Sequence, residues 1–244
     1  MSAEKAVVYI GYDPREEAAY RVAEHSLRRR ASIPVEVVKL DRALASRVMV
    51  RPVGERDGRL WCPISGAHMS TEFANIRFAV PHLQKFEGWA LFVDCDVLFV
   101  EDIAKLWELR DEQYAVQVVK HRPSDSGATK MDGQLQVQYP RKNWSSVVLW
   151  NCAHPMVRAL TRQKLEKWPG RDLHSFKWLN EAQIGALPPA WNHLVDVDPW
   201  SGNHALLHYT LGGPWFAGRE KCGYADAWLS EYKLAVREVV VHGS

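Results

Sequence analysis

The most apolar stretch of the chain is interrupted by two carboxylates. Residues 89–100 read WALFVDCDVLFV, so Leu, Phe and Val lie on both sides of Asp94 and Asp96. Such a run is typical of a buried strand, a turn and a short second strand. Two ionised carboxylates in this setting lose hydration and repel each other unless a cation is shared between them. The run therefore predicts a central strand that ends at a divalent metal site.

A plainer interpretation of the same pair stays open. Asp94 could cap a turn while Asp96 faces solvent, as polar residues at strand ends often do. The metal hypothesis gains from the expected location, because ligands bind at the carboxyl ends of strands in α/β sheets. There the pair could hold a hard cation through oxygen while phosphates complete its coordination shell.

Strands and helices alternate in the first part of the chain. Residues 7–12 are rich in β-branched and aromatic residues, and Asp13-Pro14 is a helix-start signal, so a strand should lead into a helix ending near residue 30. Residues 35–40 have the composition of a second strand. This order predicts an α/β fold with a central, mostly parallel sheet flanked by helices.

The rest of the chain gives weaker signals. Residues 41–70 carry repeated Pro and Gly and predict an irregular segment with short helical pieces. Ser70 or Thr71 could cap a helix over 71–83, which Pro81 kinks or ends. Residues 121–143 predict a mobile loop able to close over a ligand. We expect further strands at 114–120, 145–150 and 205–209, and helices at 103–109, 155–167 and 174–186.

Composition narrows the class of protein. A chain of 244 residues that is 47% hydrophobic suits one compact domain over residues 1–244. Lys and Arg number 31 against 29 Asp and Glu, which gives no basic field for nucleic acid. The cysteines at 62, 95, 152 and 222 form no Cys-x-x-Cys pair, which favours reduced thiols in a cytoplasmic protein.

No signal peptide and no apolar segment of about 20 residues is present, so we expect no transmembrane segment. Near the C-terminus, aromatic and small residues recur at helical spacing: Tyr224, Trp228, Tyr232 and Ala235. Such a stripe usually packs on its own domain, although peripheral contact with a membrane or a homodimer contact would use the same face.

The metal segment resembles that of a known enzyme family. LFVDCDVLFVEDIAKLWEL is similar to the segment in glycosyltransferase family 8 and its GT-A-fold relatives that carries Asp-x-Asp, a following acidic residue and a short helix ending in Leu-Trp. Other stretches match in the same order over about residues 7 to 215: VVYIGYDPREEAAYRVAEHSL, TEFANIRFAVPHL, WSSVVLWNCAHP, EAQIGALPPAWN and ALLHYTLGGPW. The resemblance implies a GT-A fold with a nucleotide-binding half (1–105) and an acceptor half (106–244).

The resemblance implies a metal-binding group. Asp94 would contact the donor's ribose and the metal, Asp96 would chelate the metal, and His208 would be the third protein ligand. Carboxylate and imidazole suit Mn²⁺, with Mg²⁺ as the alternative. Taken by itself, His208 in a Leu-Leu-His-Tyr run could be a buried core histidine, and His204 is a competing ligand.

The donor site is expected near the first strand and the Arg-containing segment. Tyr12 and Asp13 match the place where the family contacts the nucleotide's base and ribose, although Asp13 before Pro14 could simply cap a helix. Arg77 lies among apolar residues and should be paired, either with a phosphate or with a carboxylate such as Asp94.

The resemblance also suggests catalytic residues. Glu181 and Gln183 correspond to the family's position near the anomeric carbon, with an exposed helix face as the alternative. Asn151 could bind acceptor or donor hydroxyls, or cap the helix expected from Pro155. Trp215 could stack on a sugar, although most tryptophans are core residues.

The sequence departs from the family at its closing motif. The family's Lys before Pro-Trp is missing, because Gly212-Gly213 directly precede Pro214-Trp215. The charge of the leaving diphosphate must then be met by Arg219, by Lys221 or by backbone N–H groups of the glycine pair, including Gly213.

The resulting hypothesis is a metal-dependent, retaining hexosyltransferase. The resemblance implies a UDP-hexose donor such as UDP-glucose or UDP-galactose and a saccharide or other hydroxyl acceptor, with a bacterial surface saccharide as one option. Two alternatives remain: a nucleotidyltransferase or phosphohydrolase, which also pairs carboxylates around a metal, and a non-catalytic nucleotide-sugar-binding module. Neither a Walker sequence nor a Gly-x-Gly-x-x-Gly motif supports ATP-driven or nicotinamide chemistry.

Overall fold

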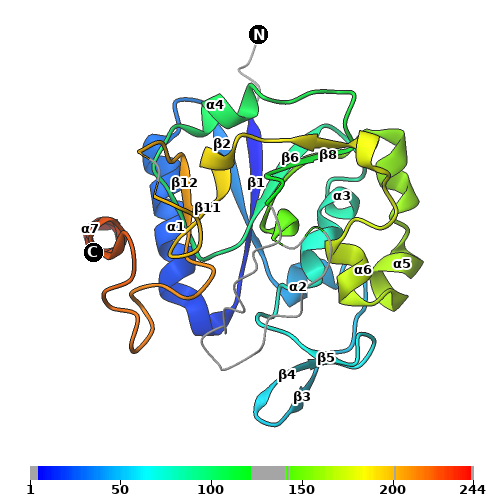
Figure 1. The fold of residues 1–244 in the computed structure, drawn as a ribbon, viewed down its shortest axis with the longest axis horizontal. Coiled ribbons are helices and arrows are strands. Elements are labelled where there is room, and N and C mark those ends of the chain that lie inside the picture. The colour runs from blue at the N-terminus through cyan, green and yellow to red at the C-terminus, as the bar shows by residue number, and fades with distance from the viewer. Residues whose placement is uncertain (1–4, 122–140, 142, 201, 243–244) are drawn as a thin grey trace.

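The computed structural model describes residues 5–121, 141, 143–200 and 202–242. Its central element is a six-stranded sheet in the order β10-β8-β9-β6-β1-β2 (Figure 1). β9 runs antiparallel to both of its neighbours, and the other five strands run in one direction. The six strands are β1 (Ala6–Gly11), β2 (Val35–Leu40), β6 (Trp89–Val93), β8 (Val116–Val118), β9 (Val147–Asn151) and β10 (Ile184–Ala186). The predicted α/β fold with a mostly parallel sheet is confirmed.

Helices cover the two sides of this sheet. Figure 1 shows α1 (Glu17–Arg30) and α7 (Ala225–His242) on one side, and α2 (Arg42–Ala45), α3 (Val80–Leu83), α5 (Arg162–Lys167) and α6 (Gly170–His174) on the other. The remaining helices are short: η1 (Pro14–Glu16), η2 (Ile76–Ala79), α4 (Ile103–Trp107), η3 (Trp144–Ser146), η4 (Pro155–Ala159), η5 (Glu181–Gln183) and η6 (Pro189–Asn192). The main core lies between the sheet and these layers.

A small second sheet joins the two halves of the chain. It has the order β11-β12-β7, with β7 (Val97–Phe99), β11 (His193–Leu194) and β12 (Leu206–His208). β12 runs antiparallel to β7, with His208 opposite Val97. Because β7 follows the Asp94–Asp96 turn directly, this pairing brings the late strand β12 to the end of β6.

The segment 41–70 contains strands where we expected irregular structure. β3 (Gly54–Arg56), β4 (Arg59–Cys62) and β5 (Ala67–His68) form an antiparallel sheet of their own. The β3–β4 hairpin turns at Asp57-Gly58, and both residues have positive φ, at 54° and 69°. Asp-Gly is a strong signal for such a two-residue turn, but the charged residues around it hide the alternation of a strand.

Three predicted helices are not continuous. The helix expected over 155–167 is broken at Leu160, so that η4 and α5 are separate and Thr161 caps α5. A helix over 71–83 is replaced by a turn, η2 and the short α3, in which Pro81 lies in the first turn. Proline has no N–H and clashes with the carbonyl four residues earlier, so one helix cannot run through it. The predicted helix 174–186 is instead the end of α6, then η5 and β10; Phe176 has a φ of +51°, which ends the helix.

The C-terminal stripe packs on its own domain. Trp228 and Ala235 are buried, and α7 lies against α1. Trp228 joins a second hydrophobic cluster with Val22, Leu98, Val195, Leu207 and Tyr209. The stripe therefore packs against the protein's own domain, as the plainer interpretation expects.

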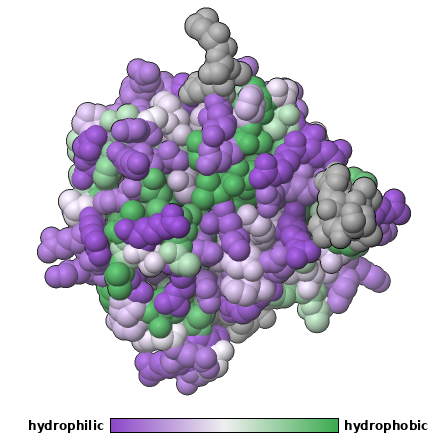
Figure 2. Space-filling model, turned by 180° about the vertical axis from the view of Figure 1, so that it is seen from behind, coloured by the Kyte–Doolittle hydropathy of each residue, from purple (hydrophilic) through white to green (hydrophobic). Residues whose placement is uncertain are grey.

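The outer surface mixes polar and apolar side chains. Figure 2 shows hydrophilic residues over much of the face seen from behind, with hydrophobic residues gathered near its centre. The described exposed large apolar side chains are Val50, Leu109, Trp200, Leu234 and Val236. Among the residues searched, none of the helices combines the length and apolar character needed to span a bilayer.

Candidate functional site

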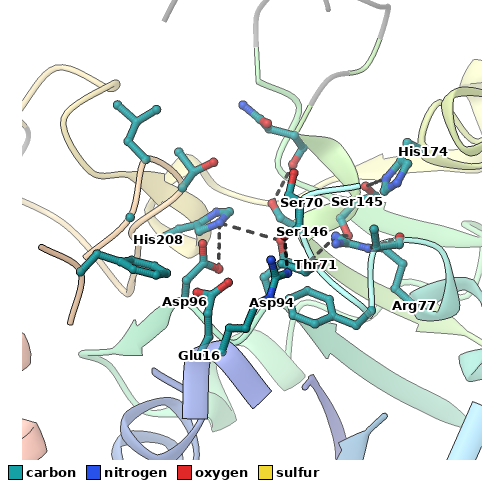
Figure 3. A pocket seen from close by; sticks show the side chains of 18 residues that line it. Glu16, Ser70, Thr71, Arg77, Asp94, Asp96, Ser145, Ser146, His174 and His208 are labelled. Atoms are coloured by element: carbon teal, nitrogen blue, oxygen red, sulfur yellow. Dashed lines mark hydrogen bonds and ion pairs between the residues drawn. The ribbon is translucent and has the colours of Figure 1, made fainter. Parts of the chain in front are cut away.

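The Asp94–Asp96 turn lies at the carboxyl end of the central strand β6. The Asp94 N–H donates to the carbonyl of Ser146 (3.0 Å), and the Tyr209 N–H donates to the carbonyl of Asp96 (2.8 Å). The residue just before β9 and the residue just after β12 therefore hold the backbone on both sides of Cys95. With the backbone fixed in this way, both carboxylates face one pocket, as Figure 3 shows.

His208 reaches the same place from the other end of the chain. Its Nε2 lies 3.3 Å from Oδ1 of Asp96 and 3.9 Å from Oδ2 of Asp94 (Figure 3). One ligand atom from each of the three side chains lies within 4.8 Å of the others. The β7–β12 pairing makes this contact, since it places His208 beside the residue that follows Asp96. His204 points elsewhere, and its Nε2 lies 2.8 Å from the hydroxyl of Tyr224.

A buried amide orients the imidazole of His208. Asn192 is fully buried, and its Oδ1 lies 2.9 Å from Nδ1 of His208. The Asn192 Nδ2 group donates to Oγ of Ser146, which in turn donates to the carbonyl of Asn143. These bonds fix the amide oxygen towards His208, so a cation bound at Nε2 would leave the proton on Nδ1, where Asn192 accepts it.

The chemistry of this donor set fits a divalent cation. Two carboxylates and a neutral imidazole offer oxygen and nitrogen ligands on one side of a pocket, which leaves the other side for phosphate oxygens. A hydrogen bond to the distal ring nitrogen is the usual companion of a metal-bound histidine. Asn192, which the sequence did not identify, supplies it here.

This arrangement predicts a specific effect of Asn192. Replacing Asn192 with Ala frees the ring of His208, and we expect Mn²⁺ to bind about 10- to 100-fold more weakly. The affinity can be measured from the electron paramagnetic resonance signal of free Mn²⁺ during a titration. Asn180→Ala, at an exposed position before η5 that does not line the pocket, serves as the control. Equal affinity in the two variants would contradict the orienting role.

Arg77 connects the candidate metal ligands Asp94, Asp96 and His208, called the metal group below, to the pocket wall. Its Nη1 lies 2.7 Å from Oδ1 of Asp94 and donates to the carbonyl of Ser145 (2.9 Å), and its Nε donates to the carbonyl of Ala74. The side chain is only 7% exposed. Of the two partners expected for Arg77, the structure shows the carboxylate Asp94.

The pocket has a volume of about 350 Å³. Its wall includes charged residues from the start of the first helix, Arg15 and Glu16, that the sequence did not single out. Burial, together with the charges of Asp96, Asp13 and Asp94, raises the pKa of Glu16 to about 8. The metal group thus lies in a strongly acidic environment, which favours a cation.

Asp13 holds Arg15 instead of lining the pocket. The fully buried Asp13 accepts from Nε (3.0 Å) and Nη2 of Arg15 (2.6 Å), and from the backbone N–H groups of Arg15 and Glu72. Burial alone would raise the pKa of Asp13, but these hydrogen bonds outweigh it and lower the pKa. Its predicted capping role is confirmed, because it caps η1. Tyr12 packs edge-on against Tyr20 and does not line the pocket.

The closing segment contributes a different glycine from the one expected. Gly212 lines the pocket, whereas Gly213 packs against Trp215: a Cβ on Gly213 would lie 1.9 Å from the indole ring. Trp215 itself packs between Tyr209 and Trp228, with ring centroids at 5.8 and 5.0 Å.

Neither basic residue proposed to replace the missing Lys lines the pocket. Arg219 pairs with Asp196 (2.6 Å) and donates to the carbonyl of Gly212, and Lys221 lies with it in a separate surface hollow. Among the described lining residues, the positive charges come from Arg15 and Arg77. Arg15 is half exposed and therefore available to a ligand.

The residues expected near the anomeric carbon do not reach the pocket wall. Glu181 pairs with Lys120 (2.8 Å) and Arg141 (2.9 Å), which lower its pKa. Gln183 accepts from the backbone N–H of Asn180. Asn151 pairs with Trp89, at the opposite end of β6 from Asp94, so the structure does not bring it to the site.

Residues 122–140 and 142 of the predicted mobile loop lie outside the described part of the chain.

Comparisons with known proteins bear on the fold and the family of the chain. The chain matches no protein-family model. Among solved structures, it aligns with the WbbM bifunctional glycosyltransferase (TM-score 0.61, 16% identity, 95% of this chain and 50% of that one). It also aligns with the galactosyltransferase LgtC in complex with donor and acceptor sugar analogs (TM-score 0.58, 15% identity, 93% of this chain and 95% of LgtC covered). The chain thus spans half the length of WbbM and nearly all of LgtC.

The fold is that of the GT-A-type glycosyltransferases. In sequence, the chain is 43% identical to Protein CDI of Arabidopsis thaliana over 230 residues, which cover 92% of this chain and 85% of the plant protein. The chain belongs to the same family as Protein CDI.

Proposed function

We propose that this protein is a metal-dependent glycosyltransferase that moves a hexose from a nucleotide sugar to an acceptor hydroxyl. The observation that carries the proposal is the meeting of Asp94, Asp96 and His208 at the carboxyl end of β6, within a GT-A fold. Membership of glycosyltransferase family 8 and use of a UDP-hexose are the finer parts of the proposal, and the sequence resemblance supports them.

Asp94, Asp96 and His208 would hold the cation, with Mn²⁺ as the first choice and Mg²⁺ as the second. A divalent cation bound there would act as a Lewis acid that neutralises the diphosphate of the donor. LgtC, whose fold this chain shares, has been crystallised with donor and acceptor sugar analogs. A nucleotide sugar in the equivalent place would lay its diphosphate across the pocket described here.

The chain's own residues would do the remaining work. Arg77 orients the carboxylate of Asp94, and Asn192 would keep the lone pair of His208 directed at the cation. Arg15, held by Asp13, presents a guanidinium at the pocket wall, where it can meet phosphate charge. Arg15 therefore replaces Arg219 and Lys221 as our candidate for the function of the missing Lys.

The acceptor would attack the sugar from the face that the diphosphate leaves, which retains the configuration of the anomeric carbon. The acceptor is a saccharide or another hydroxyl compound. Because the 43%-identical relative is a plant protein, a bacterial surface saccharide has no special support.

Product analysis tests the proposal. The protein is incubated with UDP-glucose or UDP-galactose and Mn²⁺, with and without candidate acceptors such as simple glycosides, and the products are followed by NMR. We expect free UDP and an α-configured sugar product from the α-configured donor. Pyrophosphate or orthophosphate as the main product would favour a nucleotidyltransferase or phosphohydrolase, and donor binding without turnover would favour a binding module.

A further inference from the structure

The pocket contains a serine–histidine pair that the metal group does not use. Oγ of Ser145 lies 2.7 Å from Nδ1 of His174, and both residues line the pocket. Figure 3 shows the pair on the side of the pocket away from His208 and Asp96, with Arg77 beside it. A hydroxyl hydrogen-bonded to an imidazole is an arrangement that can accept a proton from a ligand.

The surrounding structure fixes both members of the pair. The carbonyl of Ser145 accepts from Nη1 of Arg77, which also contacts Asp94, so Ser145 is tied to the metal group through one guanidinium. His174 ends α6, and its ring packs edge-on against Phe78 with centroids 5.2 Å apart. The pair is therefore held in place without a ligand.

The pair lies in a part of the wall that suits a hydroxyl-rich ligand. Besides Arg77, which lies beside the pair, the pocket wall carries the neutral polar residues Ser70, Thr71, Asn143 and Ser146. The carboxylates of the pocket lie elsewhere: Figure 3 shows Glu16 and Asp96 on the side of His208, and Asp94 faces Arg77. A cation would hold Asp94 and Asp96, which leaves the Ser145–His174 pair as a proton acceptor on the other side of the same pocket, linked to Asp94 through Arg77.

We infer that Ser145 and His174 together take the proton of the attacking acceptor hydroxyl, an inference that rests on the proposed function. As the acceptor oxygen bonds to the anomeric carbon, its proton passes to Oγ of Ser145, whose own proton passes to Nδ1 of His174. The bond from the anomeric carbon to the phosphate oxygen breaks, and the nucleoside diphosphate leaves with the electron pair. His174 then releases its proton to solvent.

The test uses water as the acceptor, because the natural acceptor is unidentified. The rate of UDP release from UDP-glucose with Mn²⁺ is compared among wild type, Ser145→Ala, His174→Ala and the double variant. We expect each single variant to lose about 10²- to 10⁴-fold in rate, and the double variant to lose no more than the larger single loss, because the two residues act as a unit. The Kd for UDP with Mn²⁺ should stay within threefold, which also shows that the variants are folded.

Added imidazole separates a proton acceptor from a structural residue. We expect it to restore part of the rate of His174→Ala but not that of Ser145→Ala. His68→Ala, in β5 and outside the pocket, receives the same imidazole as a control. The inference would be overturned if His174→Ala turned over within threefold of the wild-type rate, or if its rate were low and imidazole did not restore it. In both cases turnover by the wild type would still support the proposed function. A wild-type protein that neither binds UDP nor releases it from UDP-glucose would overturn both.

Discussion

Replacing Asp96 with Asn is expected to lower the rate of UDP release from a UDP-hexose roughly a thousandfold. The Asn side chain keeps the shape of Asp but removes a negative charge from the metal group, in which Oδ1 of Asp96 lies 3.3 Å from Nε2 of His208. The cation is then held by one carboxylate and one imidazole. The rate should be measured over a range of Mn²⁺ concentrations, and high Mn²⁺ should recover part of the loss.

Asp57→Asn is the matched control for this prediction. Asp57 lies in the β3–β4 turn with its side chain 75% exposed, and Asn tolerates its positive φ. The two variants change the net charge of the protein equally. Turnover in Asp96→Asn equal to that in Asp57→Asn would mean that Asp96 does not hold the cation.

Glu231→Ala is expected to destabilise the fold by about 3 to 5 kcal/mol. Glu231 lies in α7, is 3% exposed, and accepts hydrogen bonds from Arg29 (2.7 Å), Arg30 (3.0 Å) and His25 (2.6 Å) of α1. Its loss leaves these groups without their carboxylate at the α1–α7 contact. Urea denaturation measures the free energy of unfolding. Glu24→Ala, whose partner Arg28 is half exposed, should cost less than about 1 kcal/mol, and an equal cost in both variants would refute the prediction.

The same cluster predicts how stability depends on pH. Burial alone would raise the pKa of Glu231, but the hydrogen bonds from Arg29, Arg30 and His25 lower it from 4.5 to about 2. Because the folded-state pKa is lower than the unfolded one, this contribution of about 3 kcal/mol is complete above about pH 4.5. It is lost as the pH falls towards 2. In Glu231→Ala the acid-induced loss of stability should be smaller by about this amount.

The sequence was sufficient to predict those elements whose local pattern agrees with the tertiary structure. The β1–α1–β2 unit and the strand–turn–strand around Asp94 and Asp96 were predicted because their apolar runs are long and are bounded by clear turn signals. His208 was found from the resemblance. The structure explains its location through the β7–β12 pairing, which joins residues more than a hundred positions apart.

Other features depend on contacts that a single sequence does not reveal. Residues 184–186 form a strand because they pair with β8 at the sheet edge, although the segment resembled a helix. Asn192 acquires its role only when η6 packs against β12, and His174 only when α6 brings it to Ser145. Arg15 falls within the helix expected after Asp13-Pro14, and only its hydrogen bonds to Asp13 show that it is held at the pocket.

Metal-dependent binding of a nucleotide sugar is the central claim, and a calorimetric panel tests it most directly. UDP-, GDP-, CDP- and ADP-sugars are titrated into the wild-type protein with and without Mn²⁺. Each nucleotide sugar that binds is then titrated into Asp96→Asn as well. We predict that a UDP-sugar binds, that binding requires Mn²⁺, and that Asp96→Asn abolishes it. Absence of binding by every nucleotide sugar to folded protein with Mn²⁺ present would contradict the account.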